Sequence, residues 1–353
     1  MGEKKLMKGN EALAEAMIRA GCDAYFGYPI TPQSEVLEYL SREATQRTGM
    51  VLIQAESEVA AINMIYGAAG CGKRVMTTSS SPGISLMQEG LSYIASAELP
   101  CLLANINRGG PGLGTIQPAQ GDYFQSVKGG GHGDYHLIVL APNSVQETVD
   151  FVKLGFELAE KYRTPVMILS DGAIGQMMEK VELFPQMERV ADRGYSWQTT
   201  GKPLNGERRY ITSLHIQPEK MEEINLRLQA KYKKMQENEV RYQEMLTDDA
   251  EYLLTAFGLV SRICMKTVQL GRAKGIKLGM LRPQTLFPFP IKQFADLAPR
   301  LKGILDVEMN SGQMVEDVKL AVEGKTRVEF YGRMGGVIPT PDEILVHFEK
   351  TFL

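Results

Sequence analysis

The sequence predicts an α/β protein with a mostly parallel sheet in its first half and a second, smaller α/β domain after it. Up to about residue 170, short apolar runs alternate with longer helical stretches, which is the order of a parallel sheet covered on both faces by helices. A polar and highly charged stretch follows, and the alternation begins again near residue 250. We therefore divide the chain into residues 1–190, a linker of residues 191–249, and residues 250–353.

The expected strands of the first block are short and strongly apolar. Residues 166–169 read Val-Met-Ile-Leu, as in a strand buried on both faces. Asn143 and Ser144 are suitable N-cap residues for the helix expected after them. The expected strands are 23–27, 50–54, 74–79, 101–107, 137–141 and 165–170, and the expected helices are 9–20, 57–69, 83–97 and 144–161.

The linker and the second block follow a different pattern. Residues 192–217 are polar and hold the only tryptophan, Trp197. Pro218 begins an expected amphipathic helix that runs to about Leu246, because its apolar residues recur at spacings of three, four and seven. Beyond it we expect strands at 252–257, 277–281, 303–307 and 327–331, and helices at 261–273, 291–301, 313–322 and 341–351.

Composition excludes several classes of function. The 39 basic and 42 acidic residues give a net charge of −3, which argues against nucleic acid as a partner. No apolar run approaches the roughly 20 residues that span a bilayer, and no apolar signal core follows the N-terminus. The four cysteines are far apart, so we expect neither a disulfide framework nor an iron–sulfur cluster held by this chain. These features predict a cytoplasmic protein that binds no membrane.

Several glycine-rich or histidine-rich segments resemble phosphate, dinucleotide or metal sites but lack features that such sites need. Residues 67–73 match the start of a phosphate-binding loop, but Arg74 replaces the required Ser or Thr, and a helix is expected before the glycines instead of a strand. The glycines at 109–114 and 129–134 lack the context of a dinucleotide site, and we expect them to let backbone approach a ligand or another chain closely. His132 and His136 have too few potential ligands around them to predict a metal.

Candidate catalytic or ligand-binding residues follow three of the expected strands. Thr31 lies between two prolines directly after the first expected strand, and Arg108 follows the strand at 101–107. Glu58 opens a helix after the second strand, where Ser57 is also a plain N-cap. An arginine at such a position suits capture of a carboxylate. Because parallel sheets bind ligands at the carboxyl ends of their strands, Thr31, Glu58 and Arg108 are expected to converge there.

Together these segments resemble the thiamine-facing subunit of the 2-oxoacid:ferredoxin oxidoreductases. The motifs that carry the resemblance are residues 28–32 (Tyr-Pro-Ile-Thr-Pro), 56–61, 78–83 and 107–111, and later 281–290. The resemblance implies a parallel-sheet thiamine pyrimidine-binding domain followed by a transketolase C-terminal-like domain. Within the family, residues 6–12 and 128–134 are most similar to the branch that acts on 3-methyl-2-oxobutanoate.

The resemblance also implies an activity and roles for residues. The family decarboxylates a 2-oxoacid on thiamine diphosphate, reduces ferredoxin and transfers the acyl group to coenzyme A. By motif position Glu58 would contact N1′ of the aminopyrimidine, and Arg108 and Thr31 would hold the substrate. Tyr28, Pro29 and Ser81 belong to the same motifs. Their place in the motifs implies that all three contact the cofactor.

The chain lacks parts that this reaction needs. No Gly-Asp-Gly with a downstream Asn is present to hold magnesium and diphosphate, and no cysteine cluster is present to carry electrons. The resemblance therefore places magnesium and the iron–sulfur clusters in partner subunits, with the active site at an interface. Two alternatives stay open: an enzyme of this class acting on pyruvate or 2-oxoglutarate, and a non-catalytic assembly subunit.

Overall fold

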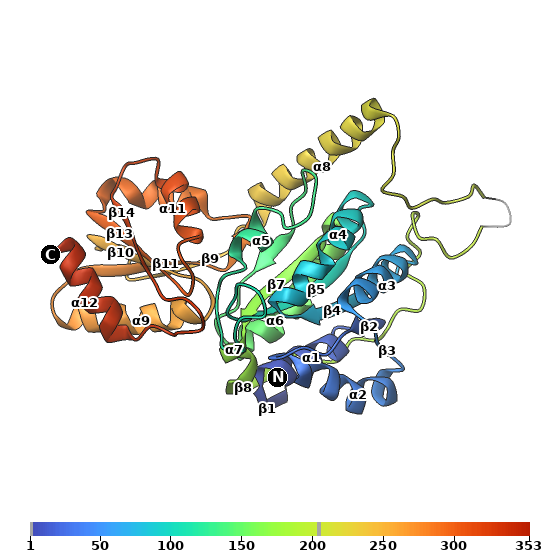
Figure 1. Cartoon of the computed structure of the whole chain (residues 1–353), viewed down its shortest axis with the longest axis horizontal. Coiled ribbons are helices and arrows are strands. Elements are labelled where there is room, and N and C mark those ends of the chain that lie inside the picture. Colours follow the sequence, from blue (N-terminus) through green and yellow to red (C-terminus); the bar gives the residue numbers. More distant parts are fainter. Residues whose placement is uncertain (1–2, 203–205) are drawn as a thin grey trace.

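The computed structural model describes residues 3–202 and 206–353, and two large sheets organise this part of the chain (Figure 1). The first sheet has the strand order β12-β6-β7-β5-β4-β2-β3, and all neighbours except β12 and β6 are parallel. Strands β4, β5 and β7 are buried throughout, as their apolar sequences predict. The strands are β2 (Ala24–Gly27), β3 (Val51–Gln54), β4 (Val75–Ser79), β5 (Cys101–Asn107), β6 (Ile138–Leu140), β7 (Pro165–Asp171) and β12 (Thr285–Phe287).

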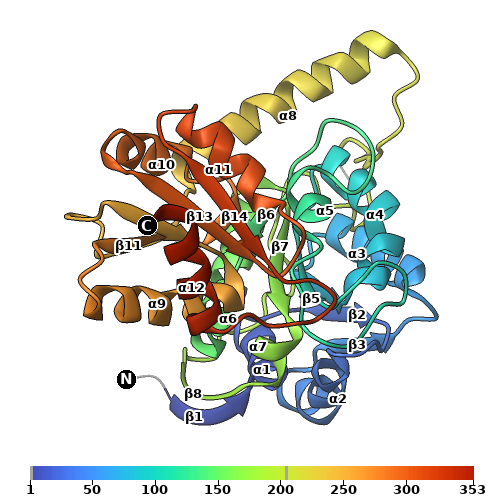
Figure 2. The ribbon, with the colours of Figure 1, turned by 60° about the vertical axis from the view of Figure 1, so that its left-hand side comes forward.

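Helices cover both faces of this sheet. Helix α1 packs on α2 and α6, whereas α3 packs on α4, and the two groups lie on opposite sides of β5 and β7 (Figure 2). A small antiparallel pair, β1 (Glu3–Lys8) with β8 (Met178–Leu183), joins the two ends of this block. The helices are α1 (Gly9–Arg19), α2 (Ser34–Thr48), α3 (Glu58–Gly70), α4 (Ser81–Ser96), α5 (Tyr123–Val127), α6 (Val145–Tyr162) and α7 (Gly172–Gln176).

The second sheet has the order β14-β13-β10-β11-β9, with only β9 antiparallel to its neighbour in the described residues. Its strands are β9 (Tyr242–Met245), β10 (Tyr252–Thr255), β11 (Leu278–Pro283), β13 (Gly303–Glu308) and β14 (Val328–Gly332). Its helices are α9 (Gly258–Ala273), α10 (Ile291–Leu297), the short η1 (Ala298–Arg300), α11 (Met314–Val322) and α12 (Pro341–Phe352). No helix in the described ranges is long and apolar enough to cross a membrane.

The linker helix differs from its prediction at one end. Helix α8 begins at Pro218 as expected and buries Ile224, Leu228, Tyr232 and Met235 on one stripe. It ends at Asn238 instead of continuing to Leu246, because the following residues form β9 and pair with β11. Leu246 itself has a φ of 53°, which no α-helix contains.

A buried ion pair explains why one strand from beyond residue 250 completes the first sheet. Arg282 on β11 is almost fully buried and donates to Glu147 of α6 at 2.8 Å and to the Ala141 carbonyl at 3.0 Å. Gln284 accepts from the Ala141 amide. This contact places the next residues beside β6, where β12 pairs with it in antiparallel register.

Candidate active site

The carboxyl ends of β2 to β5 bring the predicted site residues to one edge of the first sheet. The pairing of Gly27 with Gln54 and of Ser79 with Asn105 aligns the ends of these strands. The segments that follow them carry Thr31, Glu58, Ser81 and Arg108 respectively.

Arg108, Thr31 and Ser81 form a hydrogen-bonded group. The Arg108 Nη1 donates to the Thr31 carbonyl at 3.0 Å. The Ser81 hydroxyl accepts from the Arg108 amide at 3.1 Å, and it lies 3.2 Å from the Arg108 carbonyl as a donor. Arg108 is only 8% exposed, and in the described residues no acid pairs with it and its Nε has no partner. The guanidinium therefore keeps hydrogen-bonding capacity for an anion.

Side chains from α1 and α7 hold the turn that carries Thr31. The Pro32 carbonyl accepts from Asn10 of α1 at 2.7 Å and from Gln176 of α7 at 3.3 Å. Glu35 accepts from the same two side chains. Thr31 itself stays exposed, so its hydroxyl is accessible while its backbone is fixed.

Glu58 is a buried carboxylate without a partner in the part of the chain that the structure describes. It is the first residue of α3, where the Ser57 hydroxyl caps the helix by accepting from the Ala60 amide. The Glu58 side chain is 5% exposed and forms no hydrogen bond or ion pair within the described residues. Burying an uncompensated carboxylate is costly, which makes Glu58 a candidate for a functional group.

Gly83 makes room for this carboxylate at the start of α4. A Cβ at Gly83 would lie 2.4 Å from Glu58 Oε1 and 2.1 Å from the Ser79 hydroxyl, so no other residue fits without displacing them. The Glu58 carboxylate thus packs against the backbone of Gly83, where a side chain would displace it.

Several buried polar atoms around this edge have no partner among the described residues: Ser79 Oγ, Ser80 Oγ, Asn107 Nδ2 and Arg108 Nε. Native proteins satisfy nearly all such groups, so their concentration here points to a polar ligand or another chain. The cradle at Gly83 and the unpaired Glu58 fit a flat, polar heterocycle such as the aminopyrimidine of thiamine diphosphate. In the described ranges no three His, Cys, Asp or Glu residues gather where they could hold a metal ion.

Two of the predicted cofactor residues, Tyr28 and Pro29, are exposed, whereas Glu58, Ser81 and Arg108 are buried. Tyr28 is 37% exposed and Pro29 is also exposed. The Tyr28 carbonyl accepts from Gln33 at 3.3 Å, and among the described residues the Tyr28 hydroxyl makes no hydrogen bond to Glu58, Ser81 or Arg108.

Sequence reasoning missed a buried polar layer beneath the site. Thr78 bonds to the Tyr25 hydroxyl at 2.7 Å and to Gln33 at 2.5 Å. Asn105 donates to Asp122 at 2.8 Å, and burial raises the pKa of Asp122 despite this bond. The signal was present in the sequence, since these polar residues interrupt apolar strands that are buried on both faces.

A loop of the second block touches the segment that follows Arg108. Gly109 donates to the Gln117 carbonyl at 2.9 Å and closes a hairpin over residues 109–117. A Cβ at Gly336 would lie 2.4 Å from the Gln117 Cβ, and a Cβ at Gly109 would lie 3.1 Å from the Gly335 carbonyl carbon. The loop after β14 therefore packs backbone against backbone beside the arginine.

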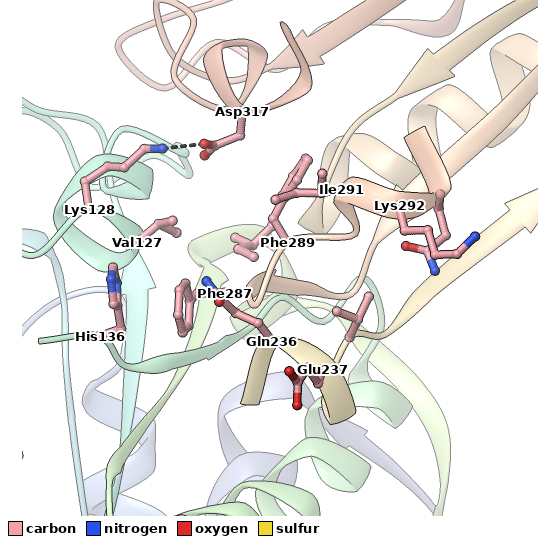
Figure 3. Close-up of a pocket in the computed structure, with 13 residues that line it drawn as sticks. Val127, Lys128, His136, Gln236, Glu237, Phe287, Phe289, Ile291, Lys292 and Asp317 are labelled. Carbon is pink, nitrogen blue, oxygen red and sulfur yellow. Dashed lines mark hydrogen bonds and ion pairs between the residues drawn. The ribbon is translucent and has the colours of Figure 1, made fainter. Parts of the chain in front are cut away.

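A cleft lies elsewhere in the molecule, between α5, α8, α10 and α11 (Figure 3). It has a volume of about 560 Å³, and Lys128 pairs with Asp317 across it. On its wall His136 stacks on Phe287 with ring centroids 4.3 Å apart, and burial lowers the pKa of His136. None of Thr31, Glu58 and Arg108 lines this cleft.

Two family models match the chain. The model described as "Pyruvate flavodoxin/ferredoxin oxidoreductase, thiamine diP-bdg" matches residues 15–244. The model of "Pyruvate:ferredoxin oxidoreductase core domain II" matches residues 250–344.

Curated relatives agree with these matches. The chain is 51% identical to the ketoisovalerate oxidoreductase subunit VorB of Methanothermobacter thermautotrophicus, over 94% of this chain and 93% of that protein. It is 36% identical to the 2-oxoglutarate synthase subunit KorA of the same organism, over 98% of both. It is 30% identical to the pyruvate synthase subunit PorA of Thermotoga maritima, over 86% of this chain and 80% of that protein.

Solved structures show the same architecture. The 2-oxoglutarate:ferredoxin oxidoreductase from Magnetococcus marinus, solved with 2-oxoglutarate, coenzyme A and succinyl-CoA bound, matches with a TM-score of 0.87 and 26% identity. The match covers all of this chain and 66% of that longer chain. A split-gene transketolase matches over 98% of both chains with a TM-score of 0.61 and 12% identity, a likeness of fold alone.

Proposed function

Because the chain belongs to the pyruvate flavodoxin/ferredoxin oxidoreductase family, we propose that it is a subunit of a thiamine-diphosphate-dependent 2-oxoacid:ferredoxin oxidoreductase. The 2-oxoacid, coenzyme A and two oxidised ferredoxins give acyl-coenzyme A, carbon dioxide, two reduced ferredoxins and a proton. The observation that carries the proposal is Glu58, a buried carboxylate that has no partner among the described residues and lies against the backbone of Gly83.

Glu58 would hold a proton at N1′ of the aminopyrimidine. Its position at the first turn of α3 and the cap from Ser57 fix its backbone, so that only the side-chain torsions set where the carboxylate points. When bound, thiamine diphosphate supplies the carbanion chemistry, and the protein supplies orientation and proton transfer.

Arg108 and Thr31 would orient the 2-oxoacid. One Arg108 nitrogen already donates to the Thr31 carbonyl, which sets the plane of the guanidinium and leaves other donors for the substrate carboxylate. The accessible Thr31 hydroxyl is suited to the keto oxygen. Holding the acid at both ends restricts it to a reactive geometry.

We propose 3-methyl-2-oxobutanoate as the substrate. Identity is higher to the ketoisovalerate subunit than to the 2-oxoglutarate subunit. Residues 109–117, which follow Arg108, contain no Lys, Arg or His and expose Leu113 and Ile116. In the loop after β14 Met334 is exposed, and the cation before it, Arg333, already pairs with Glu343 at 2.7 Å. A neutral branched chain suits this surface better than the second carboxylate of 2-oxoglutarate, which needs a cation.

Partner subunits would complete the site. Val51 and Ile53 on β3, Val59 and Met64 on α3, and Leu86 on α4 are exposed apolar residues on elements that adjoin Glu58. We propose that the subunit bearing magnesium, diphosphate contacts and iron–sulfur clusters covers these residues. Ferredoxin and coenzyme A would bind the assembled complex. The four cysteines are free thiols, which supports a reducing cytoplasmic location.

The decisive experiment is anaerobic reduction of ferredoxin by the purified complex with thiamine diphosphate, magnesium, coenzyme A and a panel of 2-oxoacids. We expect fastest reduction with 3-methyl-2-oxobutanoate, and at least about 100-fold slower turnover in Glu58→Gln with the complex still assembled. A preference for pyruvate or 2-oxoglutarate would keep the enzyme class and change the substrate. Full activity of Glu58→Gln, or no reduction with any acid, would contradict the proposal.

A further inference from the structure

Ser79, the last residue of β4, carries a fully buried hydroxyl that no described residue bonds. Its oxygen and Glu58 Oε1 lie 2.1 and 2.4 Å from the same point, the position of a Cβ on Gly83. The two oxygens are therefore at most 4.5 Å apart, the sum of those distances. Two buried polar groups that have no partner in the described ranges thus lie on either side of the free space at Gly83.

Burying these two polar groups destabilises the fold unless they form a hydrogen bond with each other. A buried hydroxyl without a partner destabilises a fold, and alanine or glycine at the end of β4 would avoid that cost. A small change in the side-chain torsion of Glu58 or Ser79 brings a hydroxyl and a carboxylate at this separation into hydrogen-bonding distance. Gly83 leaves the space in which they meet.

We propose that Ser79 is a positioning residue for Glu58. Its hydroxyl donates to one carboxylate oxygen and fixes the orientation of the carboxylate, so that the other oxygen faces N1′ of the aminopyrimidine. The inference rests on the proposed function, because Ser79 has this task only if Glu58 contacts the cofactor. It adds a second residue, from a different strand, to the group that sets the protonation of the pyrimidine.

The strand offers a matched control. Thr77 lies two residues before Ser79, hence on the same face of β4, and its hydroxyl is likewise buried without a partner among residues 3–202 and 206–353. Thr77 is two residues further than Ser79 from the end of β4. Thr77→Val removes a hydroxyl of the same kind without touching the Glu58 cradle.

The test compares Ser79→Ala, Thr77→Val and Glu58→Gln in the assembled complex. Three quantities are measured: the dissociation constant for thiamine diphosphate, the near-ultraviolet circular-dichroism band that reports the imino form of the bound pyrimidine, and kcat and KM for the 2-oxoacid. For Ser79→Ala we expect about tenfold lower kcat, a weakened imino band and an unchanged KM, since a hydrogen bond to a charged group is lost. Thr77→Val should match the wild type in all three.

The outcomes separate this inference from the proposed function. If Ser79→Ala keeps the wild-type band and kcat while Glu58→Gln loses both, Ser79 has no positioning role and the proposed function stands. If Glu58→Gln also keeps both, the proposed function fails and this inference with it. Should Ser79→Ala not assemble, Ser79→Cys fills the same space with a weaker donor. A wild-type band in Ser79→Cys would then overturn the inference.

Discussion

Arg108 donates its Nη1–H to the main-chain carbonyl of Thr31 and not to the threonine hydroxyl. The bond ties the end of β5 to the turn after β2, and it leaves the hydroxyl free for other contacts. The positions of both proposed substrate contacts thus depend on one guanidinium. Replacing it affects the geometry of the turn as well as the charge of the site.

Arg108→Lys should impair the enzyme although it keeps the charge. A single ammonium cannot hold the Thr31 carbonyl and also meet a carboxylate through two parallel hydrogen bonds. We expect kcat/KM for the 2-oxoacid to fall about 100-fold, mostly through KM, in steady-state assays. Arg42→Lys, at an exposed position on α2, serves as the control. Equal kcat/KM in the two variants would rule out a bidentate role for Arg108.

Gly83→Ala should remove the space that Glu58 and Ser79 occupy. The added methyl would lie 2.4 and 2.1 Å from their oxygens, so the carboxylate must turn away. We expect thiamine diphosphate affinity to drop at least about tenfold in equilibrium binding to the complex. Gly67→Ala is the control, because nothing lies within 4 Å of its added methyl on α3. Undiminished binding by Gly83→Ala would show that the cradle is not needed.

Gly336→Ala should raise the KM for the 2-oxoacid. The methyl would meet the Gln117 Cβ at 2.4 Å and push the hairpin at 109–117, whose base is Arg108. Gly335→Ala is a matched control, since its φ of 65° carries similar backbone strain but its methyl meets nothing within 4 Å. The prediction fails if both variants shift KM equally, because strain alone would then explain the effect.

Arg282→Met should destabilise the junction of the two sheets. Burial opposes ionisation of Glu147, yet the hydrogen bonds and charge of Arg282 outweigh burial and lower the pKa of Glu147. Removing Arg282 leaves a partly buried carboxylate unpaired, which costs about 3 kcal/mol in comparable pairs. Thermal unfolding should show a lower midpoint for Arg282→Met, and the double variant with Glu147→Leu should recover part of the loss. No recovery in the double variant would mean that the pair contributes little.

The raised pKa of Asp171 predicts that the stability of the protein depends on pH. Burial raises the pKa of this carboxyl to about 6, although backbone amides of α7 bond to it. The folded state therefore favours the protonated form of Asp171. The contribution of this group to the free energy of unfolding is greatest below its unfolded pKa near 3.8, and it is lost as the pH rises to about 6. Asp171→Asn, which keeps an acceptor for those amides, should be more stable than the wild type at pH 7 by up to about 3 kcal/mol. Parallel unfolding curves of the two proteins from pH 4 to 7 would contradict the assignment.

The sequence predicted the strands better than the contacts between segments. Apolar runs such as residues 166–169 locate a buried strand by composition alone. Helix α2 was missed although Val36, Tyr39, Leu40 and Ala44 recur at helical spacing on its buried side. Strand ends placed Thr31, Glu58 and Arg108 at one edge. The Gly83 cradle could not be foreseen, because it depends on how closely α4 approaches α3, a distance that no local pattern encodes.

Strand β12 has a consequence for biosynthesis. It pairs with β6, yet nearly 150 residues separate the two in the chain, so a nascent polypeptide presents β6 as an open edge until residue 287 leaves the ribosome. During that interval the unpaired amides and carbonyls of β6 are available to other chains. A fragment cut at the apparent boundary near residue 250 would keep that edge open permanently, and it would aggregate where the whole chain does not.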